Sequence, residues 1–368
     1  MRISSITTSA VHVNHRGDWL FVHVQTDEGI AGVGEASHSG SDAETAALIR
    51  ALEGKLKGRS ALALEEIWDD MRKDAQSRSD FCALSGIEMA LWEIRSKAEG
   101  KPVCELLGEP LRKEIKLYAN INRCTVDRSP EGFARIALAA AEEGFPAIKL
   151  APFDEVTWKS QTIKKNEEQS AFGLQRVRRV CEAVRPSAEV FVDCHSRFHP
   201  DAAIRVSEQL HEMGVTWFEQ PVPESDPDEF SRVKENSPIR IAGGEEANVR
   251  QTYRPLFERN GFDILMPDVK NIGGIGELKR TAEMANERNL LVAPHGPSGP
   301  ISIAAGAHAM SIVKNFMILE YPFGEIPWRK DLTNPPEEIK KGHLILSDRP
   351  GLGLELDRKT VSEHPAGF

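Results

Sequence analysis

The chain has 368 residues. At roughly 150 residues per domain, this length allows two or three domains, or one barrel with an appended domain. Its 46 basic and 56 acidic side chains give a formal net charge of −10, which repels phosphates and argues against nucleic acid as a partner. An apolar share of 40% and a charged share of 28% are typical of a globular enzyme.

The sequence predicts neither a targeting segment nor a membrane span. Ser, Thr and His interrupt the N-terminal residues too often for a signal peptide. The most apolar stretch, from Ile301 to Val313, is shorter than the ~18 residues of a membrane helix. Five scattered cysteines without a CxxC pair favour a reducing compartment. We therefore expect a cytoplasmic protein that does not contact a membrane.

Residues 1–114 predict a small α+β domain. Strand-like alternation covers the first ~35 residues, with turn residues at Asp27-Glu28-Gly29. From Asp42 to about Lys97 the apolar residues recur with a helical period. Gly100-Lys101-Pro102 then predicts the end of the last helix.

Residues 115–330 repeat a short apolar run followed by a helical stretch. Eight strands alternating with helices, without a glycine-rich phosphate turn after the first strand, favour a (β/α)₈ barrel over a doubly wound sheet. The tail, 331–368, holds two more strand-like runs and is expected to return to the first domain. The eight barrel runs are 115–120, 147–150, 190–195, 216–221, 239–245, 264–268, 290–295 and 316–320.

Ionisable residues stand at the ends of the predicted barrel strands, where the catalytic groups of this architecture lie. Asp193, Glu219 and Glu245 are spaced by 26 residues, one βα repeat each. Three carboxylates from adjacent strands would converge on one hard cation, and Mg²⁺ is the expected ion. Carboxylates that cap the following helices are the alternative. The shared register favours the metal site.

Two histidines and a lysine accompany these carboxylates. Asp268 and His295 end neighbouring strands, so the aspartate is expected to fix the imidazole tautomer and leave the other ring nitrogen to abstract a proton. His195, two residues after Asp193, is expected to face the same side of its strand. Lys149 lies in an apolar strand and is a candidate partner for a substrate carboxylate or an enolate.

These motifs resemble those of the enolase superfamily, in particular its mandelate racemase-like acid-sugar dehydratases. The resemblance covers nearly the whole chain. It implies an α/β fold with a modified (β/α)₈ TIM barrel and an α+β N-terminal capping domain, completed by the C-terminal segment. The motifs, in barrel order, are Asp193-Cys194-His195, Phe218-Glu219-Gln220-Pro221, Gly243-Gly244-Glu245, Pro267-Asp268 with Gly273-Gly274, Pro294-His295 and Leu319-Glu320.

The resemblance also implies roles for single residues. One Mg²⁺ per subunit is expected on the three carboxylates named above, and His295 with Asp268 is expected to act as the base. Glu320 would be a partner of the substrate carboxylate and, if protonated, would help to stabilise the enediolate. His195 lies in an Asp-x-His motif like that of galactonate and mannonate dehydratases, and would assist departure of the hydroxyl. A homo-oligomer is expected.

One departure from the family pattern bears on the reaction. Racemases of this group carry Lys-x-Lys on the second strand, whereas here the triplet is Lys149-Leu150-Ala151. Without the second lysine, one face of the substrate lacks the usual base for racemisation. Lys270, two residues after Asp268, leaves open a lysine base of the kind expected in muconate-lactonising relatives.

The predicted function is Mg²⁺-dependent dehydration of a small-molecule carboxylate, an acid sugar. The enzyme would remove the proton α to the carboxylate and eliminate the β-hydroxyl, giving a 2-keto-3-deoxy acid. The alternatives are a cycloisomerase of a sugar-acid lactone or anhydro sugar acid, a racemase or epimerase of a 2-hydroxy acid, and a non-catalytic sugar-acid sensor. The candidate substrate-binding residues are Arg16 and Trp19 in one expected cap loop, His38 in a second, and Arg197 and Lys270 in the barrel domain.

Overall fold

An antiparallel sheet and a set of helices form the N-terminal part of the chain, called the cap below (residues 3–107). The computed structural model describes residues 1–15, 17–157 and 162–367. The cap sheet has the order β1-β2-β3, which confirms the predicted α+β unit. Its elements are β1 (Ile3–Asn14), β2 (Gly17–Thr26), β3 (Ala31–Glu35), α1 (Asp42–Leu56), α2 (Leu64–Asp74), α3 (Arg78–Glu99) and α4 (Val103–Leu107).

Helix α3 packs directly on the cap sheet because β3 carries glycines where the two elements meet. A Cβ at Gly32 would lie 2.0 Å from the carbonyl oxygen of Ala90, and one at Gly34 would lie 1.8 Å from that of Gly86. The helix ends at Gly100, whose φ of 67° is a left-handed cap. This end agrees with the prediction.

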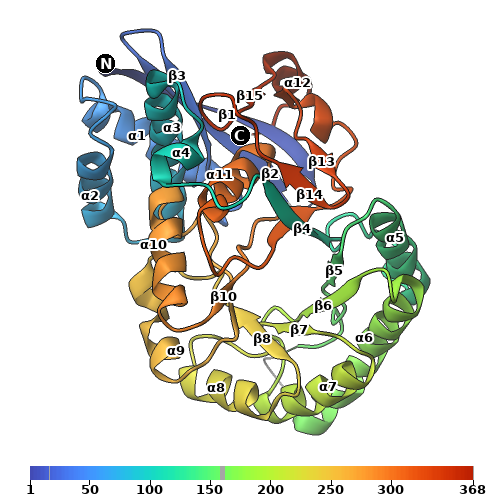
Figure 1. The fold of residues 1–368 in the computed structure, drawn as a ribbon. Coiled ribbons are helices and arrows are strands. Elements are labelled where there is room, and N and C mark those ends of the chain that lie inside the picture. Colours follow the sequence, from blue (N-terminus) through green and yellow to red (C-terminus); the bar gives the residue numbers. More distant parts are fainter. Residues whose placement is uncertain (16, 158–161, 368) are drawn as a thin grey trace.

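Eight parallel strands form a closed barrel, as the sequence predicts (Figure 1). The strand order follows the chain from β4 to β10, and β11 pairs in parallel with β4. A bridge between Val292 and Phe316 joins β10 to the segment before β11. The strands are β4 (Glu114–Asn120), β5 (Ala147–Leu150), β6 (Glu189–Asp193), β7 (Trp217–Glu219), β8 (Arg240–Gly243), β9 (Ile264–Leu265), β10 (Leu291–Val292) and β11 (Leu319–Pro322).

Helices cover the outside of the barrel between successive strands. The most apolar stretch of the sequence forms α11, which is buried on every side because it contacts both the cap and the barrel. Among the described residues, no helix has the length and apolarity that a membrane crossing requires. The elements are α5 (Pro130–Glu142), α6 (Ile163–Val184), α7 (Pro200–Glu212), α8 (Pro227–Asn236), η2 (Arg250–Tyr253), α9 (Arg254–Glu258), α10 (Ile275–Asn286) and α11 (Pro300–Ser311).

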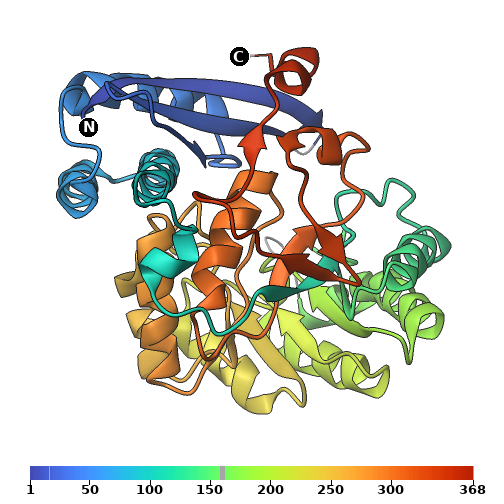
Figure 2. The same cartoon turned by 45° about the horizontal axis from the view of Figure 1, so that its top comes forward.

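The C-terminal segment contacts both the barrel and the cap. The first run expected to return to the cap instead forms β14, which pairs antiparallel with β4 and extends the barrel sheet. The end of the chain does reach the cap, where Pro365 forms a bridge with Val11 (Figure 2). The elements are η3 (Arg329–Asp331), β12 (Thr333–Asn334), β13 (Ile339–Lys340), β14 (His343–Ile345), β15 (Glu355–Leu356) and α12 (Arg358–Glu363).

Two buried glutamates of the cap bind the N-termini of barrel helices. Glu88 of α3 accepts hydrogen bonds of 2.7 and 2.8 Å from the first two backbone N–H groups of α10. Glu35 at the end of β3 accepts bonds of 2.8 and 3.0 Å from backbone N–H groups at the start of α11. These amides have no partner within their own helix, and a carboxylate complements the helix dipole. The glutamates therefore hold the cap on the barrel.

Ionisation of Glu88 should make stability depend on pH. Burial raises the pKa of Glu88 to about 7 from its ordinary 4.5. Because the native protein keeps this proton while the unfolded chain loses it, the free energy of unfolding should fall as pH rises from about 4.5 to about 7, by at most about 3 kcal/mol. Glu88→Gln should flatten this decline, measured as the melting temperature against pH. The exposed Glu65→Gln should keep the wild-type slope, and an unchanged slope in Glu88→Gln would contradict the assignment.

Candidate active site

The carboxyl ends of the barrel strands bring together the residues that the sequence singled out. Adjacent strands are in register, with Asp193 of β6 opposite Glu219 of β7. Four candidates lie within strands: Lys149, Asp193, Glu219 and Glu320. Four lie two or three residues beyond a strand end: His195, Glu245, Asp268 and His295.

Asp268 and His295 make the predicted contact. Nδ1 of His295 lies 2.7 Å from Oδ2 of Asp268. Nζ of Lys270 lies 2.6 Å from the same oxygen. Burial alone would raise the pKa of Asp268, but Lys270 and His295 lower it below its usual range, so the carboxylate stays charged. Nζ of Lys270 is engaged in this ion pair, which disfavours the lysine base that the sequence left open.

The second ring nitrogen of His295 faces other carboxylates. Nε2 lies 3.2 Å from Oε2 of Glu245 and 3.9 Å from Oε2 of Glu320. Burial lowers the pKa of His295, but Glu245, Glu320 and Asp268 outweigh it and raise the pKa above its ordinary value. With Nδ1 bound to Asp268, Nε2 is the nitrogen that can exchange a proton with a substrate.

His195 contacts Asp193 through a turn of the chain that the sequence did not predict. Strand β6 ends at Asp193, and His195 and Ser196 have φ values of 47° and 57°. The expectation that strand alternation orients His195 is therefore wrong. Asp193 accepts the backbone N–H of His195 at 3.0 Å, and its Oδ2 lies 2.9 Å from Nε2 of the ring. The side chain of His195 is 40% exposed, so a substrate can reach it. Left-handed backbone outside glycine is common at functional sites.

Lys149 is buried between two carboxylates. Its Nζ lies 2.8 Å from Oε1 of Glu219 and 3.1 Å from Oε1 of Glu320. Asn120, at the end of β4, donates to Glu320 at 2.6 Å; the sequence analysis missed it because only ionisable strand ends were considered. Burial raises the pKa of Glu320, but Lys149 and His295 lower it below its ordinary value. Glu320 is therefore ionised, which disfavours the protonated form that it would need to stabilise an enediolate.

The chemistry of this cluster fits a divalent cation. Burial raises the pKa of Glu219 and of Glu245, and the nearby Asp193 raises both further. Among the described residues, no three His, Cys, Asp or Glu side chains stand as a formed metal centre. Ion pairs hold the carboxylates instead. Five carboxyl groups gather here with two amines. Their formal charges leave an excess of three negative charges, which a divalent cation would offset. The carboxyl groups are those of Asp193, Glu219, Glu245, Asp268 and Glu320, and the amines are those of Lys149 and Lys270.

Three other candidates for substrate contact have different positions. Arg16 lies outside the described residues. Trp19 is within β2 and not in a loop, so the loop assignment is wrong; its side chain is fully buried and lies edge-on to Trp328. Arg197 lies beside the site: it lines a small hollow together with Asp193 and His195, and it donates to the carbonyl of Phe153 at 2.8 Å.

His38 is the candidate from the cap that approaches the strand ends. Burial lowers the pKa of His38 well below its ordinary value, and Arg123 and Lys270 lower it further, so the ring is neutral. The negative charge of Asp268 opposes this decrease and raises the pKa of His38 in part. His38 therefore lies within electrostatic range of the Asp268–His295 pair. Arg123 and its ion-pair partner Glu325 were missed because they lie in loops without a recognisable motif.

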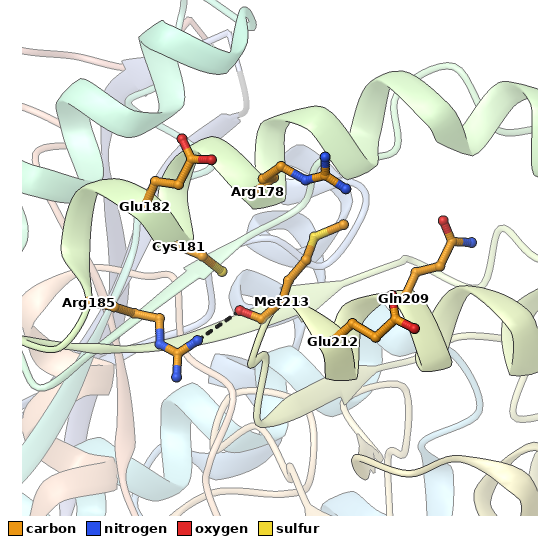
Figure 3. A pocket seen from close by; sticks show the side chains of 7 residues that line it. All are labelled: Arg178, Cys181, Glu182, Arg185, Gln209, Glu212 and Met213. Carbon is orange, nitrogen blue, oxygen red and sulfur yellow. Dashed lines mark hydrogen bonds between the residues drawn. The ribbon is translucent and has the colours of Figure 1, made fainter.

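One hollow of the surface lies away from the strand ends. It has a volume of about 580 Å³ and lies between α6 and α7, where Arg185 donates to the carbonyl of Met213 at 3.0 Å (Figure 3). The lining residues come from the C-terminal parts of both helices. In a (β/α) barrel this is the face opposite the catalytic one, so the hollow is not part of the candidate active site.

The buried carboxylates and the His–Asp pair lie at the strand ends of a barrel that carries a cap. This arrangement is typical of a class of barrel enzymes whose site lies beneath the cap. Residues 3–108 match the mandelate racemase/muconate lactonizing enzyme N-terminal domain family, and residues 132–360 match the enolase C-terminal domain-like family. The chain belongs to the enolase superfamily, in its mandelate racemase/muconate lactonizing enzyme group, as its motifs indicate.

Relatives match along nearly the whole chain. D-xylonate dehydratase of Haloferax volcanii is 30% identical over 98% of this chain and 88% of its own. D-galactonate dehydratase of Pectobacterium atrosepticum is 30% identical over 99% of this chain and 94% of its own. D-galactarolactone cycloisomerase of Agrobacterium fabrum is 29% identical over 94% of this chain and 90% of its own. The crystal structure of a mandelate racemase/muconate lactonizing enzyme-like protein from Rubrobacter xylanophilus has a TM-score of 0.90 and 32% identity, covering 100% of this chain and 98% of the other.

Proposed function

We propose that the protein is a Mg²⁺-dependent hydro-lyase that converts an acid sugar into a 2-keto-3-deoxy acid. The observation that carries the proposal is a pair of histidines at two different strand ends: His295, held by Asp268, and His195, which follows Asp193 and is exposed. Dehydration needs two proton transfers, at the α-carbon and at the β-hydroxyl. The relatives named D-xylonate and D-galactonate dehydratase support the substrate class.

The first proton transfer is assigned to His295. Its Nε2 takes the proton α to the carboxylate, while Asp268, bound at Nδ1, stabilises the imidazolium that forms. The electron pair of the C–H bond moves into the carboxylate and gives an enediolate. The buried ammonium of Lys149 offsets part of this charge, and Glu320 holds Lys149 in place through an ion pair of 3.1 Å.

The second transfer is assigned to His195. It donates a proton to the β-hydroxyl, the C–O bond breaks, and water leaves. The resulting enol takes a solvent proton at the β-carbon, gives up the proton of its α-hydroxyl to solvent and becomes the 2-keto-3-deoxy acid. Asp193, Glu219 and Glu245 would hold the Mg²⁺, which when bound stabilises negative charge on the substrate carboxylate. Because Asp193 holds His195 in the structure, engagement of Asp193 as a ligand would free the imidazole for this step.

A panel of acid sugars tests the function. With Mg²⁺ present, at least one member should yield a 2-keto product that reacts with semicarbazide, and EDTA should abolish the turnover. Turnover of a lactone without 2-keto product would support a cycloisomerase, and absence of any turnover would support a binding protein without catalysis; either outcome would contradict the proposal. The 29% identical relative named D-galactarolactone cycloisomerase favours cycloisomerisation as the second candidate, so the panel includes sugar-acid lactones.

Metal binding can be measured without turnover. Glu219→Gln should weaken Mg²⁺ or Mn²⁺ binding by at least about 100-fold, since it removes one of three charged ligands. Titration calorimetry gives the affinity, and circular dichroism reports whether the fold is retained. Glu189→Gln, at the opposite end of the barrel, is the control and should bind as the wild type does. Equal affinity in Glu219→Gln would exclude Glu219 as a ligand.

A further inference from the structure

Three residues meet where the cap covers the ends of β4 and β11, and we call them the distal cluster: His38, Arg123 and Glu325. They come from the cap loop after β3, the loop after β4 and the segment after β11. Nη1 of Arg123 lies 2.8 Å from Oε1 of Glu325 and 3.4 Å from Nε2 of His38. The reaction steps described above use none of the three.

The distal cluster lies on the same face of the barrel as the reacting groups. Strands β4 and β11 pair with each other, and Glu320 of β11 is held by Asn120 of β4. Arg123 follows the end of β4 and Glu325 follows the end of β11. A substrate whose carboxylate end lay among the strand-end groups, and whose other end extended toward the cap, would meet the distal cluster.

The distal cluster has no surplus positive charge. The Glu325 side chain is 0% exposed and that of Arg123 is 15% exposed, so solvent screens their ion pair only weakly. Asn14 of the cap also donates to Oε1 of Glu325, at 3.4 Å. The second oxygen, Oε2, is buried, and none of the described residues donates a hydrogen bond to it. The cluster thus holds a neutralised guanidinium, a neutral imidazole and a buried carboxylate oxygen that accepts no hydrogen bond from the described residues.

This charge distribution discriminates between two ends that an acid sugar can present. A second carboxylate would meet a guanidinium already neutralised and a buried carboxylate of like charge, which is unfavourable. A hydroxyl can donate to a carboxylate oxygen and accept from Arg123 or His38.

We infer that the distal cluster selects aldonates, acid sugars with one carboxylate and a hydroxylated far end, over aldarates, which carry a carboxylate at both ends. The inference rests on the proposed function and adds the substrate class. His38, Arg123 and Glu325 determine specificity, and none of them transfers a proton in the reaction.

Wild-type selectivity is the first test. We expect kcat/KM for the best aldonate, among galactonate, xylonate and gluconate, to exceed that for galactarate and glucarate by about 100-fold or more, because a like charge is brought against Glu325. Equal or preferred turnover of an aldarate would overturn the inference and leave dehydration standing. Absence of turnover for both classes would remove the proposed function, and the inference with it.

Glu325→Gln is the second test, because it frees the Arg123 guanidinium to bind a carboxylate. The ratio of aldarate to aldonate kcat/KM should rise by about tenfold or more. The matched control is Glu337→Gln, which breaks another buried Arg–Glu pair: Nε of Arg329 lies 2.7 Å from Glu337. It should lower stability while keeping the wild-type ratio. An unchanged ratio in folded Glu325→Gln would overturn the assignment, and so would an equal rise in Glu337→Gln.

Discussion

Exchange of the substrate α-proton with solvent deuterium should be lost in His295→Asn. Nε2 of His295 is the proposed base, and asparagine cannot accept the proton at neutral pH. General base catalysis typically contributes roughly 10²–10⁴-fold, so both exchange and dehydration should fall by at least that range. Asp268→Asn should act in the same direction, because the ring loses the carboxylate that lies 2.7 Å from Nδ1. Exchange is measured by proton NMR in D₂O.

Two further variants make this result specific. His211→Asn changes an exposed histidine on α7 and should exchange at the wild-type rate. If exchange survives in His295→Asn, another group takes the proton. Lys149 and Lys270 are then the bases to test, although both are held in ion pairs of 2.8 and 2.6 Å.

His195→Asn should separate the two proton transfers. Dehydration should fall by about 10²–10⁴-fold, the usual contribution of a general acid. Exchange of the α-proton should continue, because the Asp268–His295 pair and Lys149 are unchanged. Rates of exchange and of 2-keto product formation, measured on the same sample, give the comparison.

Other outcomes would assign His195 a different role. An equal loss of exchange and dehydration would place it in stabilising the enediolate, or in positioning Asp193, which it contacts at 2.9 Å. Unchanged dehydration would show that it takes no part in the reaction. Either result would contradict the assignment of His195 as the acid that releases the hydroxyl.

The sequence predicted the barrel and the Asp268–His295 contact because both follow from local patterns. Buried parallel strands read as short apolar runs, and their carboxyl ends meet at one face whatever the intervening helices do. Residues at the ends of consecutive strands are therefore neighbours. The same reasoning placed Asp193 beside Glu219, which the register of β6 and β7 confirms.

Contacts that depend on loops and on the cap could not be predicted in this way. His195 lies past the end of β6, where its φ of 47° makes strand alternation irrelevant. Trp19 reads as a loop residue beside polar neighbours, yet it is buried in β2. Arg123 meets Glu325 across 202 residues, a separation at which only the folded chain shows the pairing. β14 joined the barrel because residues 114–116 of β4 precede its pairing with β5 and β11 and were open to pairing.

The position of solvent deuterium in the product tests the proposed reaction most directly. Wild-type enzyme is incubated with Mg²⁺ and an aldonate that it consumes, in D₂O, and followed by proton NMR. Proton removal by His295 and loss of the β-hydroxyl assisted by His195 predict a 2-keto-3-deoxy acid with one solvent deuterium at C3 and no proton at C2. A product that keeps its C2 proton, or an inverted 2-hydroxy acid with deuterium at C2 and no 2-keto acid, would contradict dehydration.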